Sequence, residues 1–463
     1  MKTVHDLLNI DSDIQVLGIT DDSRDVKEGY IFVATHGFHE DHFDYIQEAI
    51  DAGACFLVVD KEPKVDFPHI IVDNIDSTYR ELCKKFYDLD FSKFHFIGIT
   101  GTDGKTTTAT VLSQLLENCA YLGTNGLTIH GKTIPTNNTT PCISELYRDL
   151  SLIQKEGIST VSMEVSSEAL FFDRVKDLSF EVVCFTNVTG DHLNTHKTME
   201  EYFACKKKLL DLLKKDGLVV LNGDDSYLQT IRHPNLITFG FGEDNTIQIQ
   251  SFKEHKRGSS FVIHQEKDLF IESPLPGKYN AYNLTMASIV ASYLGVDSKE
   301  IKKKIKELSP IQGRAEFLDF GQDYDILLDY AHTINGIRTI LDTFQDYNRM
   351  IVVTGAAGGR ETQKRPVIGK MIIEKSDIAV FTMDDPRYES VDDIIDQMVG
   401  DAKDYVRIID REEAIFYALS IASKGDIVLI LGKGRDNYMA IKDKKVPYCD
   451  YDVIENYFQK KRT

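Results

Sequence analysis

The stretch HFIGITGTDGKTTTATVLSQLLENC, residues 95–119, decides the fold class of this chain. Its first six residues are mostly apolar, which predicts a buried strand, and the apolar spacing after residue 105 predicts a helix. The glycines between them let the backbone come close to a phosphate, and the helix N-terminus behind them supplies free amides and a favourable dipole. The order of strand, glycine-rich turn and helix predicts a nucleotide site in an α/β domain.

The residues that we expect to hold the phosphates are consecutive in the turn: Gly101, Thr102, Asp103, Gly104, Lys105, Thr106 and Thr107. Among them, Lys105 would meet the β and γ phosphates, and Thr106 would bind a magnesium ion. The spacing departs from the strict P-loop pattern GxxxxGK[ST], because Gly98 precedes Gly104 by one residue too many. An incidental glycine turn is the alternative, which the flanking strand and helix disfavour.

The rest of the chain predicts more structure of the same class. Apolar runs at 159–165, 181–188 and 217–223 alternate with helical segments such as 198–215, as expected of a doubly wound parallel sheet. Residues 246–272 alternate in polarity around a polar turn, which predicts an antiparallel excursion.

The length of 463 residues predicts two to four domains, and we interpret the pattern as three. Residues 1–92 mix short apolar strands with a helix, and a second nucleotide-fold-like alternation restarts after residues 312–322. The predicted domains are residues 1–93, 94–318 and 319–463. The first is small and α/β, the second is a P-loop-like doubly wound domain, and the third is Rossmann-like.

Composition and charge exclude several classes of protein. A formal net charge of -20 argues against a general binder of nucleic acids or anionic membranes, because phosphate backbones need a basic surface. No apolar run reaches the length of a signal peptide or a membrane span. The seven cysteines are scattered without a CxxC pair, which fits reduced thiols better than a zinc ribbon or a disulfide framework. We therefore expect a cytoplasmic protein.

Four motifs identify a family. GTDGKTT resembles the ATP loop of the Mur ligases and of their folylpolyglutamate synthase relatives, and MEVSS (163–167), NVTGDHLNTH (187–196) and YFACKKKLL (202–210) resemble later motifs of these ligases. The resemblance implies ATP, two magnesium ions with Thr106, Glu164 and His192 as ligands, and a carbamylated Lys206 near the metal. By themselves, Glu164 would be interpreted as a capping or solvated side chain and Lys206 as part of a solvated helix face. A neutral imidazole also suits magnesium poorly.

The N-terminal pattern DSRDVKEGYIFVA at 22–34 distinguishes between these relatives. It resembles the UDP-sugar-binding domain of the Mur ligases that act on a muramoyl peptide, a domain that folylpolyglutamate synthases lack. The resemblance places Ser23 and Arg24 at the uracil and diphosphate end. The guanidinium fork fits a phosphate well, although an ion pair of Arg24 with a surface acid is the alternative.

Further segments resemble the substrate and nucleotide contacts of the family. The expected contacts to the muramoyl peptide are Thr139, Thr140, Ser167 and Arg174. The expected contacts to the nucleotide are Asn280, Asn283, Arg314, Asp329 and His332. The chain departs from the family pattern at Glu168, Ile334 and Asn335, which puts details of the neighbouring loops in doubt.

The loops GAAGGRETQKRP (355–366), DDPR (384–387) and GKGRD (432–436) resemble the amino-acid-binding loops of the MurE branch, which adds the third residue. Arg360, Asp385, Arg387 and Asp436 are therefore expected near an incoming diamino acid. The common diaminopimelate patterns are DNPR and GKGHE. Asp385 favours an ammonium group and Arg387 favours a carboxylate, and one such contact is worth about 4 kcal/mol at ~4 Å before desolvation. We weakly favour L-lysine, with Asp436 as a partner of its ammonium group.

The resemblance thus implies an ATP-dependent ligase that adds a diamino acid to UDP-MurNAc-L-Ala-D-Glu through an acyl phosphate. We expect a monomer without nucleic-acid or membrane partners. The alternatives are a related ligase that acts on another carboxylate such as a folate, a nucleotide-gated binding protein, and a divergent paralogue with weak activity.

Overall fold

The computed structural model describes residues 2–36, 41–190 and 198–462. The chain forms two compact units, which are described separately below. The first unit comprises residues 1–98 and 118–181, and the second comprises residues 99–117 and 182–463.

The first unit begins with a small α/β layer structure. Its four-stranded parallel sheet has the order β3 (Gly18–Thr20), β4 (Tyr30–Val33), β5 (Ala54–Val59) and β6 (His69–Ile71). The helices of this part are α1 (Val4–Leu8), α2 (Ile46–Asp51) and α3 (Ile75–Phe86), and β1 (Lys2–Thr3) pairs with β2 (Gln15–Val16). The inner strands β4 and β5 are buried almost throughout, which explains why their sequences are continuously apolar.

The remainder of the first unit contributes to the largest sheet. Parallel strands β8 (Cys119–Gly123) and β11 (Thr160–Glu164) are neighbours in it, and β9 (Gly126–Ile129) and β10 (Lys132–Ile134) extend it antiparallel beyond β8. The helices are α5 (Ile143–Lys155) and α6 (Ser167–Phe171). Strand β11 is one of the predicted apolar runs, and it ends on Glu164.

The second unit contains the stretch that decided the fold class. Strand β7 (His95–Thr100) leads into helix α4 (Lys105–Leu115), and β12 (Phe180–Phe185) follows; both strands are divided between the units. The amide of Thr186 donates to the carbonyl of Thr100 (2.9 Å), so the ends of β7 and β12 lie together. The prediction of strand, turn and helix is confirmed.

The same sheet continues through five further strands of the second unit. Strands β13 (Leu213–Asn222), β14 (Leu236–Gly240) and β15 (Ile247–His255) are parallel, whereas β16 (Gly258–His264) and β17 (Leu269–Ser273) are antiparallel. The predicted antiparallel excursion is confirmed. The predicted helix over 198–215 is partly wrong: α8 (Met199–Lys207) ends in a 3-10 turn, and β13 begins at Leu213. Tertiary pairing overrides the local helix propensity there.

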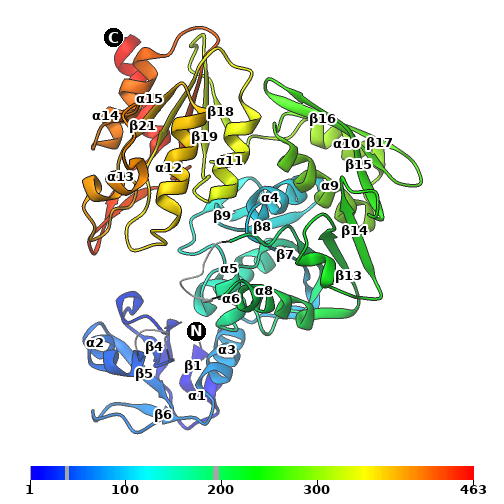
Figure 1. Cartoon of the computed structure of the whole chain (residues 1–463). Helices are drawn as coiled ribbons and strands as arrows, with labels where there is room; N and C mark the ends of the chain where they lie inside the picture. The colour runs from blue at the N-terminus through cyan, green and yellow to red at the C-terminus, as the bar shows by residue number, and fades with distance from the viewer. Residues whose placement is uncertain (1, 37–40, 191–197, 463) are drawn as a thin grey trace. The chain divides into compact units, whose positions relative to one another are not determined.

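The C-terminal part of the second unit is a six-stranded, mainly parallel sheet. Its order is β18 (Glu316–Leu318), β19 (Asp325–Asp329), β23 (Ile427–Leu431), β20 (Met350–Thr354), β21 (Ile378–Phe381) and β22 (Val406–Arg407), with β18 antiparallel. One core joins the sheet to α11 (Ile334–Thr343), α12 (Lys364–Lys375) and α13 (Val391–Val399). A second core joins the opposite face to α14 (Arg411–Ile421) and α15 (Asp450–Arg462) (Figure 1). Because helices cover both faces, the predicted Rossmann-like arrangement is confirmed.

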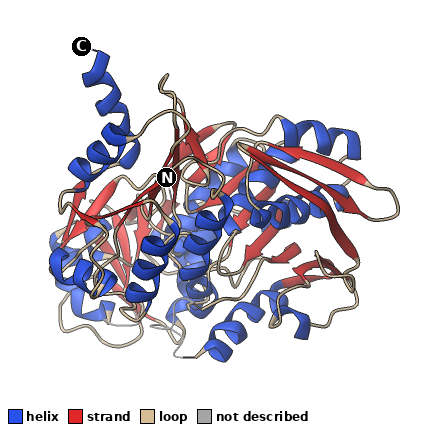
Figure 2. Cartoon of the chain, turned by 45° about the horizontal axis from the view of Figure 1, so that its top comes forward, coloured by secondary structure: helices blue, strands red, loops and turns tan. Residues whose placement is uncertain are grey.

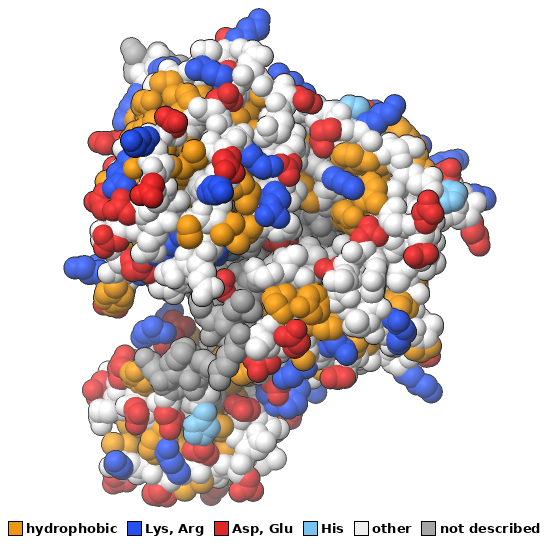
Figure 3. Space-filling view, viewed as in Figure 1, with side chains coloured by type: hydrophobic (Ala, Val, Ile, Leu, Met, Phe, Trp, Pro, Cys, Tyr) orange, Lys and Arg blue, Asp and Glu red, His pale blue; other side chains and the backbone are white. Residues whose placement is uncertain are grey.

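Helices α9 (Lys278–Tyr293) and α10 (Ser298–Lys306) complete the second unit, and a hairpin of β24 (Tyr438–Ile441) and β25 (Lys444–Pro447) precedes α15. Figure 2 distinguishes the helices of the chain (blue) from its strands (red). Acidic and basic side chains are interspersed on the face shown in Figure 3. Among the described residues, no helix combines the length and the apolarity that a membrane span requires.

Candidate functional site

The phosphate turn has a backbone that only glycine fits. Gly101 (φ 145°) and Gly104 (φ 85°) both lie in the region that side chains disfavour. A Cβ atom on Gly104 would lie 2.4 Å from Oδ1 of Asn283, and one on Gly101 would lie 1.8 Å from Oγ1 of Thr186. Helix α4 starts directly after Gly104, so its free amides face the turn as predicted.

Side chains of the turn are held by hydrogen bonds within the second unit. Lys105 folds back over the turn, and its Nζ donates to the carbonyls of Gly101 (2.9 Å) and Thr102 (2.8 Å). The buried hydroxyl of Thr106 accepts from Nη2 of Arg314 (3.1 Å). The backbone of Asp103 pairs with Asn187, whose Oδ1 accepts from its amide (2.9 Å). The predicted Lys105, Thr106 and Arg314 therefore lie together.

Lys206 reaches the same turn from helix α8. Its side chain is buried, its Nζ donates to the carbonyl of Gly101 (2.8 Å), and it lies 4.3 Å from the centroid of the Tyr202 ring. Lys207 and Lys208 are exposed, as predicted for a solvated helix face. Of this lysine run, the structure thus places Lys206 alone beside the phosphate turn.

A cavity of about 530 Å³ adjoins the turn, a size typical of small-molecule sites. It is lined by predicted residues, namely Asp103, Gly104, Thr107, Asn280, Asn283, Arg314 and Asp329. His332 does not line it: the imidazole is exposed, and its Nδ1 pairs with the carbonyl of Tyr330 (2.8 Å).

The buried polar atoms of cavity residues that lack hydrogen-bond partners among the described residues include Oδ2 of Asp103 and Nε of Arg314. Buried polar atoms are normally paired, so these two favour a polar ligand in the cavity. Asp329 is different, because its carboxylate accepts from the amides of Ala315 (2.6 Å) and Ala331 (2.7 Å). Burial raises the pKa of Asp329, although nearby Arg314 opposes the shift.

Sequence reasoning missed one wall of the cavity, which contains Asp224, Lys278 and Tyr282. Asp224 follows β13, and its Oδ2 accepts from the hydroxyl of Tyr282 (2.7 Å) and the amide of Phe241 (2.6 Å). Burial alone would raise its pKa, but these hydrogen bonds lower the pKa of Asp224 below the ordinary value. Asp224 could have been identified from the sequence as an acidic residue directly after a predicted parallel strand, because ligands bind at the carboxyl ends of such strands.

In the first unit, the predicted Glu164 is the centre of a polar network. Its Oε1 accepts from the hydroxyl of Tyr121 (2.6 Å) and the amide of Thr124 (2.9 Å), and Oε2 accepts from Oγ1 of Thr124 (3.2 Å). Thr139 shares a hydrogen bond with the Thr124 hydroxyl (3.1 Å). Sequence reasoning missed Tyr121 and Thr124, which orient the carboxylate.

The predicted substrate contacts lie along the same network. The hydroxyl of Thr140 donates to the carbonyl of Glu164 (2.8 Å), and Nη1 of Arg174 donates to the carbonyl of Thr140 (3.1 Å). Ser167 is buried in the first turn of α6. The structure therefore brings Thr139, Thr140, Glu164 and Arg174 together.

The predicted UDP-binding residues lie in a 3-10 turn after β3. Ser23 is buried, and Arg24 is paired with Asp22 through Nε (2.8 Å) and Nη2 (2.6 Å), which is the alternative arrangement named above. The Arg24 side chain is 81% exposed, so this pair contributes little stability. The adjacent Asp21, which sequence reasoning missed, accepts from the hydroxyl of Tyr79 (2.9 Å), and burial raises its pKa.

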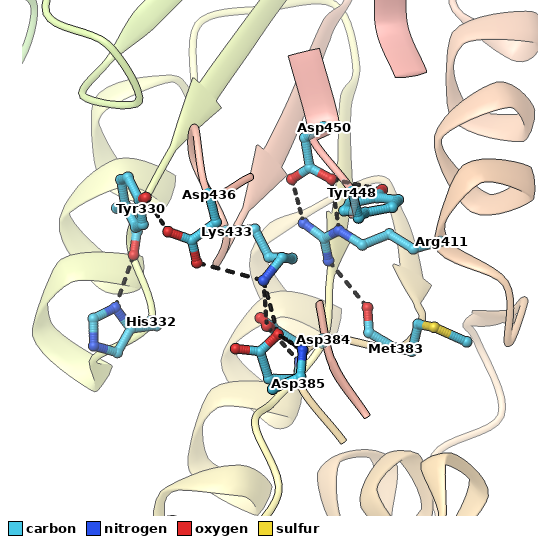
Figure 4. Close-up of polar contacts among 12 residues, drawn as sticks. Tyr330, His332, Met383, Asp384, Asp385, Arg411, Lys433, Asp436, Tyr448 and Asp450 are labelled. Atoms are coloured by element: carbon cyan, nitrogen blue, oxygen red, sulfur yellow. Dashed lines mark hydrogen bonds and ion pairs between the residues drawn. The ribbon is translucent and has the colours of Figure 1, made fainter. Parts of the chain in front are cut away.

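The predicted amino-acid loops meet around Lys433, another residue that was missed (Figure 4). Its Nζ is 2.8 Å from Oδ1 of Asp385 and 3.4 Å from Oδ2 of Asp436, and its side chain is 1% exposed. The other carboxylate oxygen of Asp436 accepts from the hydroxyl of Tyr330. Both predicted acids therefore already contact a buried cation.

The two predicted arginines of these loops differ in their surroundings. Arg387 adopts a left-handed backbone conformation (φ 50°), and its buried Nε has no hydrogen-bond partner among the described residues. Arg360 is exposed in the loop before α12. Arg387, which lies in the same loop (384–387) as Asp385, therefore retains an unused donor.

A fully buried ion pair lies behind the loops. Arg411 donates through Nε and Nη2 to the two carboxylate oxygens of Asp450, at 2.8 Å each, and both side chains are 0% exposed (Figure 4). The same guanidinium donates to the carbonyls of Leu431 (2.9 Å) and Met383 (3.3 Å). Arg411 thus holds the backbone immediately before both loops.

The predicted metal ligand His192 lies outside the described residues. Within residues 2–36, 41–190 and 198–462, no group of three or more His, Cys, Asp or Glu side chains is arranged to hold a metal ion. Magnesium at nucleotide sites is typically bound by one or two protein groups together with phosphate oxygens, so such a cluster is not required.

Comparison with known proteins identifies the family. The profile of the Mur ligase middle domain matches residues 99–291, and that of the Mur ligase glutamate ligase domain matches residues 313–434. The UDP-N-acetylmuramoyl-L-alanyl-D-glutamate–2,6-diaminopimelate ligase of Caldanaerobacter subterraneus subsp. tengcongensis is 34% identical over 472 residues, which cover 98% of this chain and 97% of the relative. The chain belongs to the Mur ligase family.

Other Mur ligases agree with this assignment. The ligase of the same name from Bacillus licheniformis is 33% identical over 461 residues, covering 96% of this chain and 94% of the relative. A solved structure of a diaminopimelate ligase of this name matches with a TM-score of 0.64 and 25% identity over 100% of this chain and 99% of that chain. MurF from Thermotoga maritima, solved in complex with ADP, matches in fold with a TM-score of 0.68 and 18% identity over 98% and 100%.

These matches confirm the α/β Mur ligase fold, with its small N-terminal, central ATPase and Rossmann-like C-terminal parts. They also confirm that the chain is an ATP-dependent ligase. The cavity beside Gly104 and Lys105 is accordingly its candidate ATP site.

Proposed function

We propose that this Mur ligase adds 2,6-diaminopimelate to UDP-MurNAc-L-Ala-D-Glu in the cytoplasm, during synthesis of the peptidoglycan precursor. Curated relatives named for this reaction align over nearly the whole chain, including the N-terminal segment that contains Ser23 and Arg24. The same full-length similarity removes the need for a folate-type ligase or a divergent paralogue with weak activity. We further propose three domains, residues 1–93, 94–318 and 319–463, and a monomer.

The contacts of Lys433 support this choice of acceptor. The preference for L-lysine predicted from the sequence assumes that Asp385 and Asp436 are available to an ammonium group, yet both carboxylates lie against the Lys433 ammonium. Arg387, in contrast, has an unpaired Nε. The far end of diaminopimelate carries a carboxylate as well as an ammonium, so it can use this donor, whereas lysine cannot. This unpaired donor is the observation that favours diaminopimelate.

The residues of the second unit would act on the ATP half-reaction as follows. The carboxylate of the UDP-linked dipeptide attacks the γ-phosphorus, ADP leaves, and an acyl phosphate forms. Lys105 and the amides at the start of α4 neutralise charge on the phosphates. The amine of the acceptor then attacks the acyl carbon, and phosphate leaves. Because acyl phosphates hydrolyse, we also expect the C-terminal part to close over the site before chemistry.

Magnesium ions would screen the negative charge on the triphosphate. Thr106 and Glu164 offer the oxygen donors that magnesium prefers, and the carboxylate of Glu164 is oriented by Tyr121 and Thr124. We propose these two residues, His192 and a carbamylated Lys206 as the metal ligands. The burial of Lys206 beside the carbonyl of Gly101 supports this role, because a carbamate replaces a buried cation by a metal-binding anion.

The test is phosphate release by the purified protein with ATP and UDP-MurNAc-L-Ala-D-Glu. Meso-diaminopimelate, L-lysine and L-ornithine are compared as acceptors, with reactions lacking the UDP-dipeptide as the control. We expect turnover with diaminopimelate to exceed that with lysine by at least about 100-fold in kcat/KM, the effect of one desolvated charge contact. A preference for lysine or ornithine would refute the proposed acceptor, and no turnover with any of the three would refute the reaction.

A further inference from the structure

Tyr330, the residue after β19, joins the ATP cavity to the amino-acid loops. Its ring packs against two glycines: a Cβ atom on Gly313 would lie 2.9 Å from the ring, and one on Gly434 would lie 2.2 Å from it. Both glycines have positive φ, so larger residues are excluded at these contacts. The ring is therefore wedged between the segment of Arg314 and the GKGRD loop.

The two ends of the tyrosine face different parts of the site. The guanidinium carbon of Arg314 lies 4.8 Å from the centroid of the ring, and the same arginine donates to Thr106 in the phosphate turn (3.1 Å). The hydroxyl donates to Oδ1 of Asp436. Asp436 in turn contacts Lys433 through Oδ2, and Lys433 contacts Asp385 (Figure 4). A continuous series of contacts therefore runs from Thr106 to Asp385.

The hydroxyl of Tyr330 has a specific effect on Asp436. Asp436 lies in a loop, where its amide donates to the carbonyl of Lys433 (2.9 Å), so the backbone is held while the carboxylate is oriented by its own contacts. One oxygen is directed by Tyr330 and the other by Lys433 at 3.4 Å, a long contact. Without the hydroxyl, the carboxylate is free to rotate towards Lys433 and to withdraw that ammonium from Asp385.

We propose that Tyr330 is a positioning residue for the acceptor amino acid, holding Asp436 and, through Lys433, Asp385 in the arrangement that the diamino acid meets. This inference rests on the proposed function, which places the acceptor at these loops. The tyrosine itself does not touch the reacting atoms, and its ring keeps Arg314 in place beside the phosphate turn independently of the hydroxyl.

The test is Tyr330→Phe, which removes the hydroxyl and leaves the wedged ring. We expect KM for the diamino acid to rise about tenfold, the effect of losing a hydrogen bond to a charged group, with kcat and KM for ATP changed less than about twofold. Asp436→Asn should raise the same KM, and the double variant should be no worse than the poorer single variant, because both act through one contact. Thermal melts verify that each variant is folded.

Tyr448→Phe is the matched control, because it also removes a tyrosyl hydroxyl that donates to a buried carboxylate, Asp450 (2.8 Å). It should leave KM for the diamino acid within about twofold. If the wild type is active, the proposed function stands and the inference is tested separately. It is overturned if both tyrosine variants have equal effects, if the effects of Tyr330→Phe and Asp436→Asn are additive, or if KM for the diamino acid is unchanged. An inactive wild type would overturn the proposed function and the inference with it.

Discussion

Replacing Asp450 by Asn tests the buried ion pair behind the amino-acid loops. The substitution keeps the shape of the side chain and removes its charge, which leaves the Arg411 guanidinium buried without a counter-ion. The Arg411 guanidinium cannot rotate towards solvent, because four hydrogen bonds to Asp450, Leu431 and Met383 hold it in place. The side chains of Arg411 and Asp450 are both 0% exposed.

The burial of this ion pair determines how much the substitution lowers the free energy of unfolding. Removing one partner of a buried ion pair costs about 3–5 kcal/mol, because the remaining charge is desolvated and uncompensated. For a unit of this size, each kcal/mol lowers the melting midpoint by about 2–4 °C, so we expect a decrease of about 6–20 °C in the transition that contains α14. Differential scanning calorimetry measures it, with hydrogen exchange of the amides in α14 and β23 assigning the transition.

Glu412→Gln is the matched control, because it makes the same change of acid to amide at the residue that follows Arg411 in the sequence. Glu412 is paired with Lys460 at 4.0 Å, and the two side chains are 49% and 69% exposed. Exposed pairs contribute at most about 1 kcal/mol, so this variant should melt within a few degrees of the wild type. Equal shifts for the two variants would refute the argument that burial makes the Arg411 pair strong.

The remaining predictions concern the ATP site and a buried acid. Gly104→Ala should abolish ATP-dependent turnover and ADP binding by calorimetry while the protein stays folded, because the new Cβ meets Asn283 at 2.4 Å and φ is positive. Lys206→Ala should lose turnover, and high formate or acetate should partly restore it; no rescue would leave Lys206 an ordinary buried lysine. Burial raises the pKa of Asp149 to about 6, so its carboxyl binds a proton more tightly in the folded state than in the unfolded chain. The free energy of unfolding therefore falls by up to about 3 kcal/mol as the pH rises from about 4 to 6. Asp149→Asn lacks this loss, so its melting midpoint should rise relative to that of the wild type across the same window.

Local patterns predicted the elements that depend on local physics. The turn from Gly101 to Lys105 was recognisable because its glycines, its lysine and the following helix are adjacent in sequence. The two faces of the C-terminal sheet were recognisable because continuously apolar strands indicate burial on both sides. The end of α8 was not, since the start of β13 at Leu213 depends on pairing with strands elsewhere in the chain.

The contacts that decide chemistry could not be predicted in the same way. Asp224 meets Tyr282 across 58 residues, and Lys433 meets Asp385 across 48 residues, so no periodic pattern joins either pair. Motif resemblance located Asp385, Arg387 and Asp436 in the loops, yet it gave no information about which charges were already neutralised. The preference for lysine predicted from the sequence therefore takes no account of Lys433.

Charge counting in a pocket is therefore reliable only after its internal pairs are known. From sequence, Asp385 and Asp436 add two negative charges and favour an ammonium ligand. In the folded chain, the buried Lys433 lies between them, and desolvation raises the pKa of Asp436 even though Lys433 and Tyr330 oppose the shift. Asp384 also lies within 3.9 Å of this ammonium, so the lysine offsets only part of the negative charge of the three acids. We propose that selectivity for the far end of the acceptor depends on Arg387, whose Nε has no internal partner among the described residues. On this proposal, a substrate carboxylate is the group that pairs with Arg387, which is what the comparison of diaminopimelate with lysine tests.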